Sequence, residues 1–259
     1  MKLFDKHAFE NRIHEIDLFR GFLIFLVMFD HLLWSINFYV FHNTQPFLNW
    51  YWTTNIRLVV QQVVLIAFLF TCGISCHFSK NNKKRGLLLL ALCLLITIST
   101  HLLQLLPAFS GRVIVIDFNV LGVICLSILT YCFCEKFSNK NLLLISGILM
   151  VFYALIVINN KTNPDITYDP FRSILYCSFN PVRAGYVADY LPLFPYIIAL
   201  FLGVLFARNF YPEKKSLFPK KKEWERPICF LGRHTLLIYI AHEILFTLIF
   251  MGIGALMNA

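Results

Sequence analysis

Charged residues are scarce in this chain: Asp, Glu, Lys and Arg together make up 14% of its 259 residues. Hydrophobic residues make up 58%, whereas a typical soluble domain is roughly 45–50% apolar and about 25% charged. This shortage of charge excludes a soluble globular protein, and the length leaves no room for a separate soluble domain. We therefore predict one all-α integral membrane domain over residues 1–259.

Several motifs of soluble and secreted proteins are also missing. The eight cysteines form no CxxC pair, and six lie inside apolar runs, where a free cysteine acts as a small hydrophobe. This pattern excludes a disulfide framework, and we expect no metal site. The sequence has no internal repeat, low-complexity tract or glycine-rich phosphate loop. Because the first fifteen residues mix acids with bases and no small-residue cleavage site follows, we expect no cleavable signal peptide.

The net charge of +9 is concentrated in short loops, chiefly 79–85 and 208–227. Basic loops beside apolar stretches are the signature of cytoplasmic membrane loops, so we expect no nucleic-acid partner. The alternate connections divide the loop Lys and Arg residues into 16 on one side of the membrane and 5 on the other. This asymmetry predicts a cytoplasmic N-terminus, in a multi-pass protein of the cytoplasmic (inner) membrane.

Seven apolar stretches are each long enough to cross a bilayer, which predicts a bundle of about seven transmembrane helices. They run near 16–39, 57–78, 86–106, 115–134, 141–159, 190–208 and 232–256. Asp117 and Asn119 push the apolar part of the fourth stretch toward its C-terminal end. Two outer segments, about 40–56 and 160–189, mix aromatic and hydrogen-bonding residues. Such a mixture suits a sugar-binding rim, and it is equally typical of an interfacial aromatic belt.

Arg20 and His31 lie in the first stretch and His42 lies just after it, and the three are spaced eleven residues apart. Eleven residues are nearly a whole number of helical turns, so each step returns to almost the same face, roughly 16 Å further along. Asp17 lies one turn before Arg20 and can pair with it. Polar groups at membrane depth are costly and indicate a functional path. A snorkelling Arg20 or a single interhelical histidine would be the structural alternative.

The last stretch holds a second group of polar residues. Arg233 and His234 lie at its inner end, and His242 and Glu243 follow two to three turns further in. An adjacent His and Glu in apolar surroundings need partners, and the first stretch can provide them. The two stretches together predict a polar site inside the membrane.

Four segments resemble one known family in order along nearly the whole chain. They read RIHEIDLFRGFLIFLVMFDH (12–31), FLFTCGIS (68–75), DYLPLFPYIIALFLG (189–203) and FLGRHTLLIYIAH (230–242). They are similar to the catalytic domain of heparan-α-glucosaminide N-acetyltransferase and its bacterial relatives. That group is similar to the broader transmembrane acyltransferases, which share an Arg and a His eleven residues apart in the first span.

The resemblance implies transfer of an acetyl group from cytosolic acetyl-CoA to a saccharide on the other side of the membrane. The acceptor group is an amine or a hydroxyl, and a bacterial envelope glycan or glycolipid is a more plausible acceptor than heparan. Arg20, Arg233 and His234 would hold the CoA phosphates. A homodimer is compatible with the broader family.

The same resemblance places His31 and His42 in transfer, supported by Asp17 and His242. An imidazole can deprotonate the acceptor or carry the acetyl group, and which histidine does which job is open. The chain departs from many bacterial relatives at Gly122, which stands where they have a histidine. Two other readings stay open: a transporter or flippase of a small anion or lipid-linked sugar, and a non-catalytic acyl-CoA-binding relative.

Overall fold

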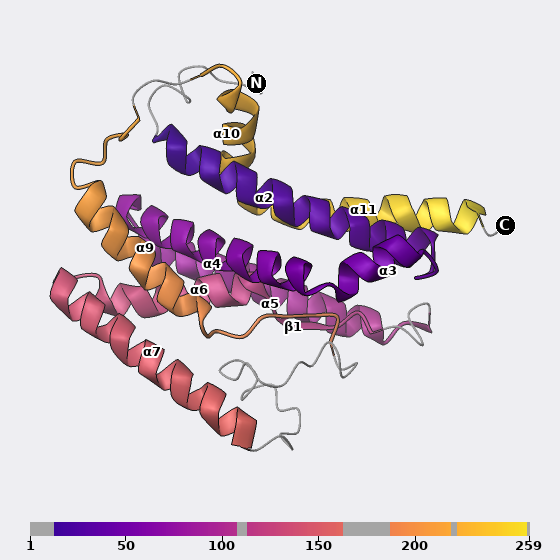
Figure 1. Cartoon of the computed structure of the whole chain (residues 1–259), viewed down its shortest axis with the longest axis horizontal. Coiled ribbons are helices and arrows are strands. Elements are labelled where there is room, and N and C mark those ends of the chain that lie inside the picture. Colours follow the sequence, from indigo (N-terminus) through magenta and orange to yellow (C-terminus); the bar gives the residue numbers. More distant parts are fainter. Residues whose placement is uncertain (1–12, 108–112, 163–186, 219–221, 258–259) are drawn as a thin grey trace. The chain divides into compact units, whose positions relative to one another are not determined.

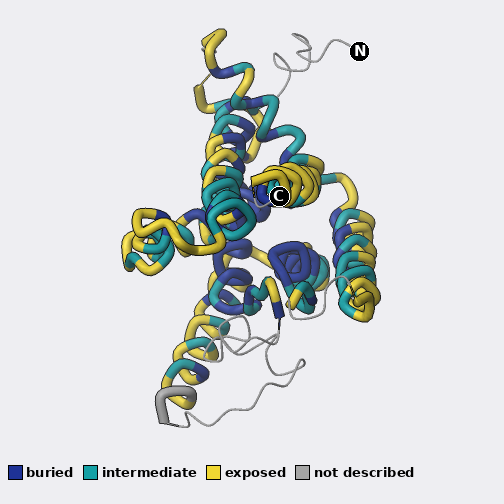
Figure 2. Tube along the Cα trace, turned by 90° about the vertical axis from the view of Figure 1, so that its right-hand side faces the viewer, coloured by how far each residue is buried: buried dark blue, intermediate teal, exposed yellow. Residues whose placement is uncertain are grey.

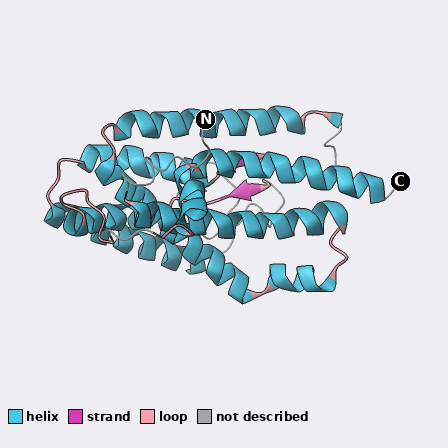
Figure 3. Ribbon diagram, turned by 90° about the horizontal axis from the view of Figure 1, so that it is seen from above, coloured by secondary structure: helices cyan, strands magenta, loops and turns pink. Residues whose placement is uncertain are grey.

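The computed structural model describes the chain in four stretches, residues 13–107, 113–162, 187–218 and 222–257. In these stretches the chain is helical, apart from one pair of short strands (Figures 1 and 3). Its contacts form two compact units, residues 1–68 with 213–259 and residues 69–212. The predicted helical class is confirmed, with the strand pair as an exception. A single domain stays a prediction.

The first unit is built around one long helix, α2. Its described elements are α2 (His14–Ser35), the π-helix η1 (Ile36–Val40), α3 (Pro46–Thr53), the start of α4 (Asn55–Phe78), α10 (Glu225–Arg233) and α11 (Thr235–Met257). Glu15 and Asp17 lie in the first turn of α2, where acidic groups complement the helix dipole. Pro46 starts α3 at the position where a missing N–H costs nothing.

Glycines let other helices approach the backbone of α2 closely. A Cβ on Gly232 of α10 would lie 1.8 Å from the carbonyl oxygen of Asp17, so no larger residue fits at this crossing. A Cβ on Gly254 of α11 would lie 2.1 Å from the carbonyl oxygen of Tyr39 in η1. The N-terminal end of α2 is therefore fixed on α10, and its π-helical extension is fixed on α11.

The second unit centres on helix α9. Its described elements are the end of α4, α5 (Asn82–Gln104), β1 (Ile116–Phe118), α6 (Val120–Cys134), α7 (Asn139–Thr162), β2 (Asp189–Tyr190) and α9 (Tyr196–Phe210). Strands β1 and β2 pair in parallel. Most of α9 is buried, and Gly73 of α4 and Gly203 of α9 are packed against each other's helix backbone.

Long rows of exposed apolar residues follow several helices. Figure 2 colours the exposed residues of the described chain yellow along the Cα trace. Leu87, Leu95 and Leu102 of α5 are examples, and α7 and α11 carry similar rows. Among the described residues, four helices are long and apolar enough to cross a membrane: α4, α5, α7 and α11. Such surfaces suit contact with lipid chains.

Each of the seven predicted spans overlaps a helix, but the structure does not confirm that all seven cross the membrane. Helices α6 and α9 have 15 residues each, about 22 Å of helix, which is shorter than a hydrocarbon core of about 30 Å. The number of spans and the cytoplasmic N-terminus remain predictions. Residues 163–186 of the outer segment predicted at 160–189 lie outside the described residues.

Helix α6 begins later than the fourth predicted span. The side chain of Asn119 accepts hydrogen bonds from the backbone N–H groups of Leu121 and Gly122, so it caps the helix at Val120. Asp117 lies on β1 instead. Asp117 therefore lies within a strand and Asn119 caps the helix that follows, which places the apolar helix in the C-terminal part of the predicted span.

Candidate active site

The predicted site residues fall into two groups within the first unit. Asp17, Arg20 and His31 lie on α2, and His42 follows η1. Arg233 ends α10, His234 caps it, and His242 lies two turns into α11. The structure brings His31 and His242 together and leaves His42 outside the helix.

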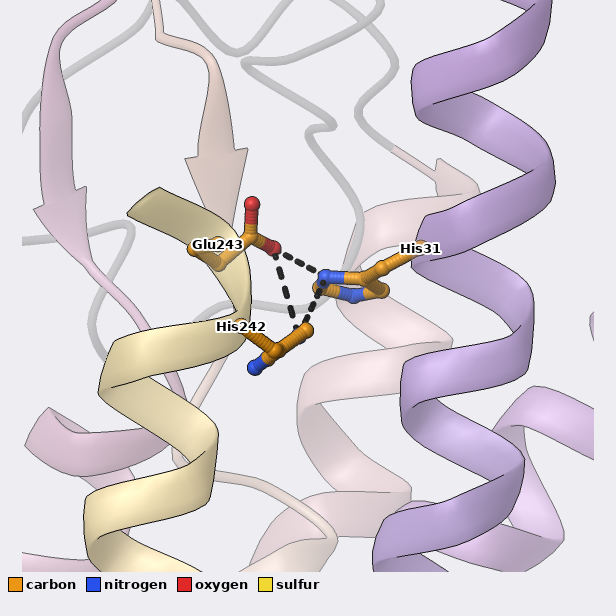
Figure 4. Close-up of side chains that lie close together, drawn as sticks. All are labelled: His31, His242 and Glu243. Carbon is orange, nitrogen blue, oxygen red and sulfur yellow. Dashed lines mark hydrogen bonds and ion pairs between the residues drawn. The ribbon is translucent and has the colours of Figure 1, made fainter. Parts of the chain in front are cut away.

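His31, His242 and Glu243 form one cluster between α2 and α11 (Figure 4). The Nδ1 atom of His31 lies 3.2 Å from Nε2 of His242, and the ring centroids are 5.0 Å apart. The carboxylate of Glu243 pairs with the same Nδ1 atom, and its Oε1 lies 3.8 Å from Nε2 of His242. The prediction that the first stretch supplies partners for His242 and Glu243 is confirmed.

Exposure differs within this cluster. The side chain of His242 is 2% exposed, whereas 33% of the His31 side chain and 43% of the Glu243 side chain are exposed. The buried ring of His242 thus packs behind the more exposed pair of His31 and Glu243.

The hydrogen bonds assign the tautomers of both rings. Nδ1 of His242 lies 3.0 Å from the carbonyl oxygen of Ile238, so this nitrogen donates and Nε2 accepts. Nδ1 of His31 faces two acceptors, Nε2 of His242 and the carboxylate of Glu243, so this nitrogen carries the proton. In neutral His31 the lone pair then lies on Nε2. The arrangement is that of a base whose tautomer and orientation a carboxylate fixes.

The residue before His31 is held by a separate network. Arg57 donates from Nε and Nη2 to the two carboxylate oxygens of Asp30, at 3.0 and 2.6 Å, and the hydroxyl of Tyr51 donates to Asp30 at 2.7 Å. The guanidinium carbon of Arg57 lies 3.7 Å from the ring centroid of Trp52. Burial, together with the hydrogen bond to Asp30, raises the pKa of Tyr51 to about 12. Helices α3 and α4 therefore anchor α2 beside His31.

The sequence leaves open whether the helix that carries Arg20 and His31 continues to His42, because Asn43, Gln45 and Pro46 favour a stop near this point, and the structure shows that it does not reach His42. The α-helix ends at Ser35, and η1 continues it with the wider π geometry, so the eleven-residue register is lost. His42 lies in a turn with φ of 47° and is exposed. Its role in transfer stays a prediction.

Asparagines explain why the helix ends here. The side chain of Asn37 donates to the side-chain oxygens of Asn43 and Asn49, at 3.2 and 3.1 Å. The backbone N–H of Asn43 donates to the carbonyl oxygen of Asn37, and Asn43 itself has φ of 60°. Asparagine tolerates this left-handed conformation better than most residues. The chain therefore turns at His42 toward α3.

The predicted donor-binding residues gather at the α2–α10 crossing. Arg20 adjoins Gly21 of α2, and Arg233 adjoins Gly232 of α10, the glycines at which the two backbones meet. Nε of Arg233 is buried and has no hydrogen-bond partner among the residues that the structure describes. The ring of His234 packs against Phe230, with centroids 4.5 Å apart. Asp17 is buried beside this crossing.

Three residues that the structure places in or beside the site, Glu243, Arg57 and Tyr51, are not among the site residues predicted from the sequence. In the sequence Glu243 is the neighbour of His242, Tyr51 belongs to the aromatic outer segment 40–56, and Arg57 directly follows that segment. A carboxylate inside an apolar stretch is the one signal that pointed to Glu243. The pairing of Asp30 with Arg57 depends on how α4 returns beside α2, and no spacing in the sequence shows that.

A comparison with known protein families identifies the family of this chain. The profile described as heparan-alpha-glucosaminide N-acetyltransferase, catalytic, matches residues 12–244, which is most of the chain and includes every residue of the cluster. The chain belongs to this family. The resemblance read from the four sequence segments is thereby confirmed, and membership implies a membrane acetyltransferase. No curated protein and no solved structure matches the chain.

Proposed function

We propose that the protein transfers acetyl groups from cytosolic acetyl-CoA to a saccharide or glycolipid on the outer side of the cytoplasmic membrane. The observation that carries this proposal is the cluster of His31, Glu243 and His242, which provides an oriented base on the first helix. Eleven residues along a helix place His31 about 16 Å from Arg20, which is near mid-depth if Arg20 lies at the cytoplasmic surface.

The α2–α10 crossing is the proposed donor site. Arg20, Arg233 and His234 supply cationic or hydrogen-bonding groups there, and the pyrophosphate and phosphate groups of CoA are anions that guanidinium groups bind well. The buried Nε of Arg233 has no hydrogen-bond partner in the described part of the chain, which is consistent with a ligand that supplies the acceptor. The pantetheine arm would then extend along α2 toward His31.

The proposed chemistry needs one base and one leaving group. Nε2 of His31 takes the proton of the acceptor hydroxyl or amine while the oxygen or nitrogen attacks the thioester carbonyl carbon. The tetrahedral intermediate then expels CoA as the C–S bond breaks, and His31 returns the proton to the leaving thiolate. Glu243 holds the Nδ1–H and stabilises the imidazolium that forms between the two steps.

The outer segment 46–53 is the proposed start of the acceptor site. Tyr51 and Trp52 both contact the Asp30–Arg57 pair, and Phe47 and Trp50 are exposed aromatic side chains. Aromatic ring faces and hydrogen-bonding groups together suit a saccharide.

Family membership favours the enzyme over the transporter or flippase. A non-catalytic relative that only binds acyl-CoA would retain the arginines at the α2–α10 crossing but would not need an oriented base. The contact between Glu243 and His31 therefore favours catalysis.

The first test uses the purified protein in liposomes with radiolabelled acetyl-CoA. It measures the release of free CoA together with the label found on the acceptor or, where water takes the acetyl group, in free acetate. We expect His31→Ala to lower turnover by at least about 10³-fold, because general-base catalysis contributes about 10²–10⁴-fold. His42→Ala tests the predicted second histidine, with a loss of at least about tenfold expected. His101→Ala is the matched control, because His101 also pairs with a carboxylate but lies in the second unit.

Full turnover by His31→Ala would contradict the proposed base. No turnover by the wild-type protein, with acetyl-CoA bound normally, would support the non-catalytic relative. Movement of a labelled anion or lipid-linked sugar across the bilayer without CoA release would support a transporter.

A further inference from the structure

The cluster between α2 and α11 also has the composition and spacing of a metal site. Three ligand atoms, Nδ1 of His31, Nε2 of His242 and a carboxylate oxygen of Glu243, all lie within 4.8 Å of one another. We propose that these three residues bind one divalent transition-metal ion of the zinc type. No ligand spacing in the sequence predicts this site, because His31 and His242 are 211 residues apart.

The donor set selects the kind of ion. Imidazole nitrogens suit zinc, cobalt and related transition metals, whereas magnesium and calcium prefer shells made of oxygen atoms. Two histidines and one glutamate are also a known zinc-ligand combination that leaves a fourth position open for water. The site would therefore discriminate against magnesium and calcium.

Local geometry prepares His242 as a ligand. Its Nδ1 donates to the carbonyl oxygen of Ile238 at 3.0 Å, which directs the Nε2 lone pair toward His31 and Glu243. Such an outer hydrogen bond fixes the ring of most metal-binding histidines. Nδ1 of His31 and Nε2 of His242 are 3.2 Å apart, close to the ~3.3 Å between two ligands of a tetrahedral zinc ion with bonds of about 2.0–2.1 Å.

Access and charge also suit a cation. The side chains of His31 and Glu243 are 33% and 43% exposed, so the protein does not enclose these two of the three ligand groups. The carboxylate offsets part of the positive charge, and the burial of His242 keeps that ligand in one orientation. Among the described residues, no other group of three His, Cys, Asp or Glu side chains has this spacing.

Metal binding has a consequence for catalysis that rests on the proposed function. An ion on Nδ1 of His31 takes the lone pair of that nitrogen, so the proton of the neutral ring moves to Nε2. His31 then cannot accept the proton of the acceptor group. A zinc-type ion at this site would therefore inhibit acetyl transfer.

The test measures metal binding directly, in the absence of acetyl-CoA. Untagged protein in detergent is stripped with a chelator and titrated with Co²⁺, whose visible absorption reports tetrahedral coordination, and then with Zn²⁺ as a competitor. We expect one Co²⁺ per chain, displaced by Zn²⁺ but not by an excess of Mg²⁺. His242→Ala and Glu243→Gln should each weaken Co²⁺ binding by more than about tenfold, since even outer-shell changes cost about 10–100-fold.

His101→Ala provides the matched control. The pair of His101 and Asp117 supplies two ligand types at 2.8 Å, and no third group of this kind completes it among the described residues. Binding should be unchanged in this variant. Absence of stoichiometric Co²⁺ binding by the wild-type protein, or equal binding by His242→Ala with an unchanged circular dichroism spectrum, would overturn the proposal. Because acetyl-CoA is absent, this result is independent of whether the protein transfers acetyl groups.

Discussion

The two units each contain an imidazole–carboxylate pair, and the pairs differ in their surroundings. In the first unit Glu243 contacts Nδ1 of His31, and the buried ring of His242 adds a second contact to the same nitrogen. In the second unit Asp117 contacts Nε2 of His101, whose side chain is 55% exposed. In the first pair the ring nitrogen that Glu243 does not contact is Nε2 of His31, which points away from the main chain and can act as the base. In the second pair the ring nitrogen that Asp117 does not contact is Nδ1 of His101, which lies close to its own main chain. Pairing alone therefore does not define a site.

The arginines of the two units show the same contrast. Arg57 binds both oxygens of one carboxylate, Asp30, and its own side chain is only 10% exposed. Arg208 of α9 donates instead to the backbone carbonyl oxygens of Glu135 and Phe137, at 2.6 Å each, near the end of α6. One arginine positions a segment that carries reactive groups, and the other completes the hydrogen bonds of a helix end.

The largest expected effect separates the two carboxylates. Glu243→Gln keeps the size of the side chain but removes the charge that holds the Nδ1 proton of His31, so turnover should fall by roughly 10³-fold or more, as when a triad aspartate is replaced by its amide. Asp117→Asn should leave turnover within about twofold, because His101 has no place in the proposed chemistry. Initial rates of CoA release at saturating acetyl-CoA compare the two variants. Equal losses in both would mean that the two pairs are not functionally different.

The arginines provide the next comparison, in stability. Arg57→Met leaves a largely buried Asp30 carboxylate without its cation. The free energy of unfolding should therefore fall by about 3 kcal/mol, at the low end of values for a broken buried ion pair. Arg208→Met should cost about 1 kcal/mol, because water can reach the carbonyl groups that it leaves. Thermal unfolding in detergent measures both. A larger loss in Arg208→Met would reverse the assignment of the two arginines.

Much of the fold follows from hydrophobic length and helix-stop signals. The apolar stretches near 57–78, 86–106 and 141–159 correspond closely to α4, α5 and α7, because a run of apolar residues bounded by polar ones has few other structures to adopt. The end of α2 was less predictable. It depends on side-chain bonds from Asn37 to Asn43 and Asn49, and no periodicity in the sequence reveals those contacts.

The site was predictable where polar residues stand in apolar surroundings. His31 and His242 were selected for that reason, and their contact is present in the structure. Arg57 stands near the end of a polar loop, where its charge is not unusual in sequence terms. Its importance comes from the return of α4 beside α2, a tertiary feature that the local sequence does not encode.

The smallest expected effect separates two tyrosines. The hydroxyl of Tyr51 donates to Asp30 at 2.7 Å, but Arg57 binds both oxygens of the same carboxylate, so Tyr51→Phe leaves Asp30 satisfied. We expect a loss of about 1 kcal/mol in unfolding free energy, the usual value of one hydrogen bond. Tyr131→Phe in the second unit removes only a 3.3 Å contact with Arg208 and should cost about half as much. Thermal unfolding in detergent compares the two variants. If Tyr51→Phe lowers the unfolding free energy as much as Arg57→Met does, then the tyrosine, rather than the arginine, holds Asp30 in place beside His31.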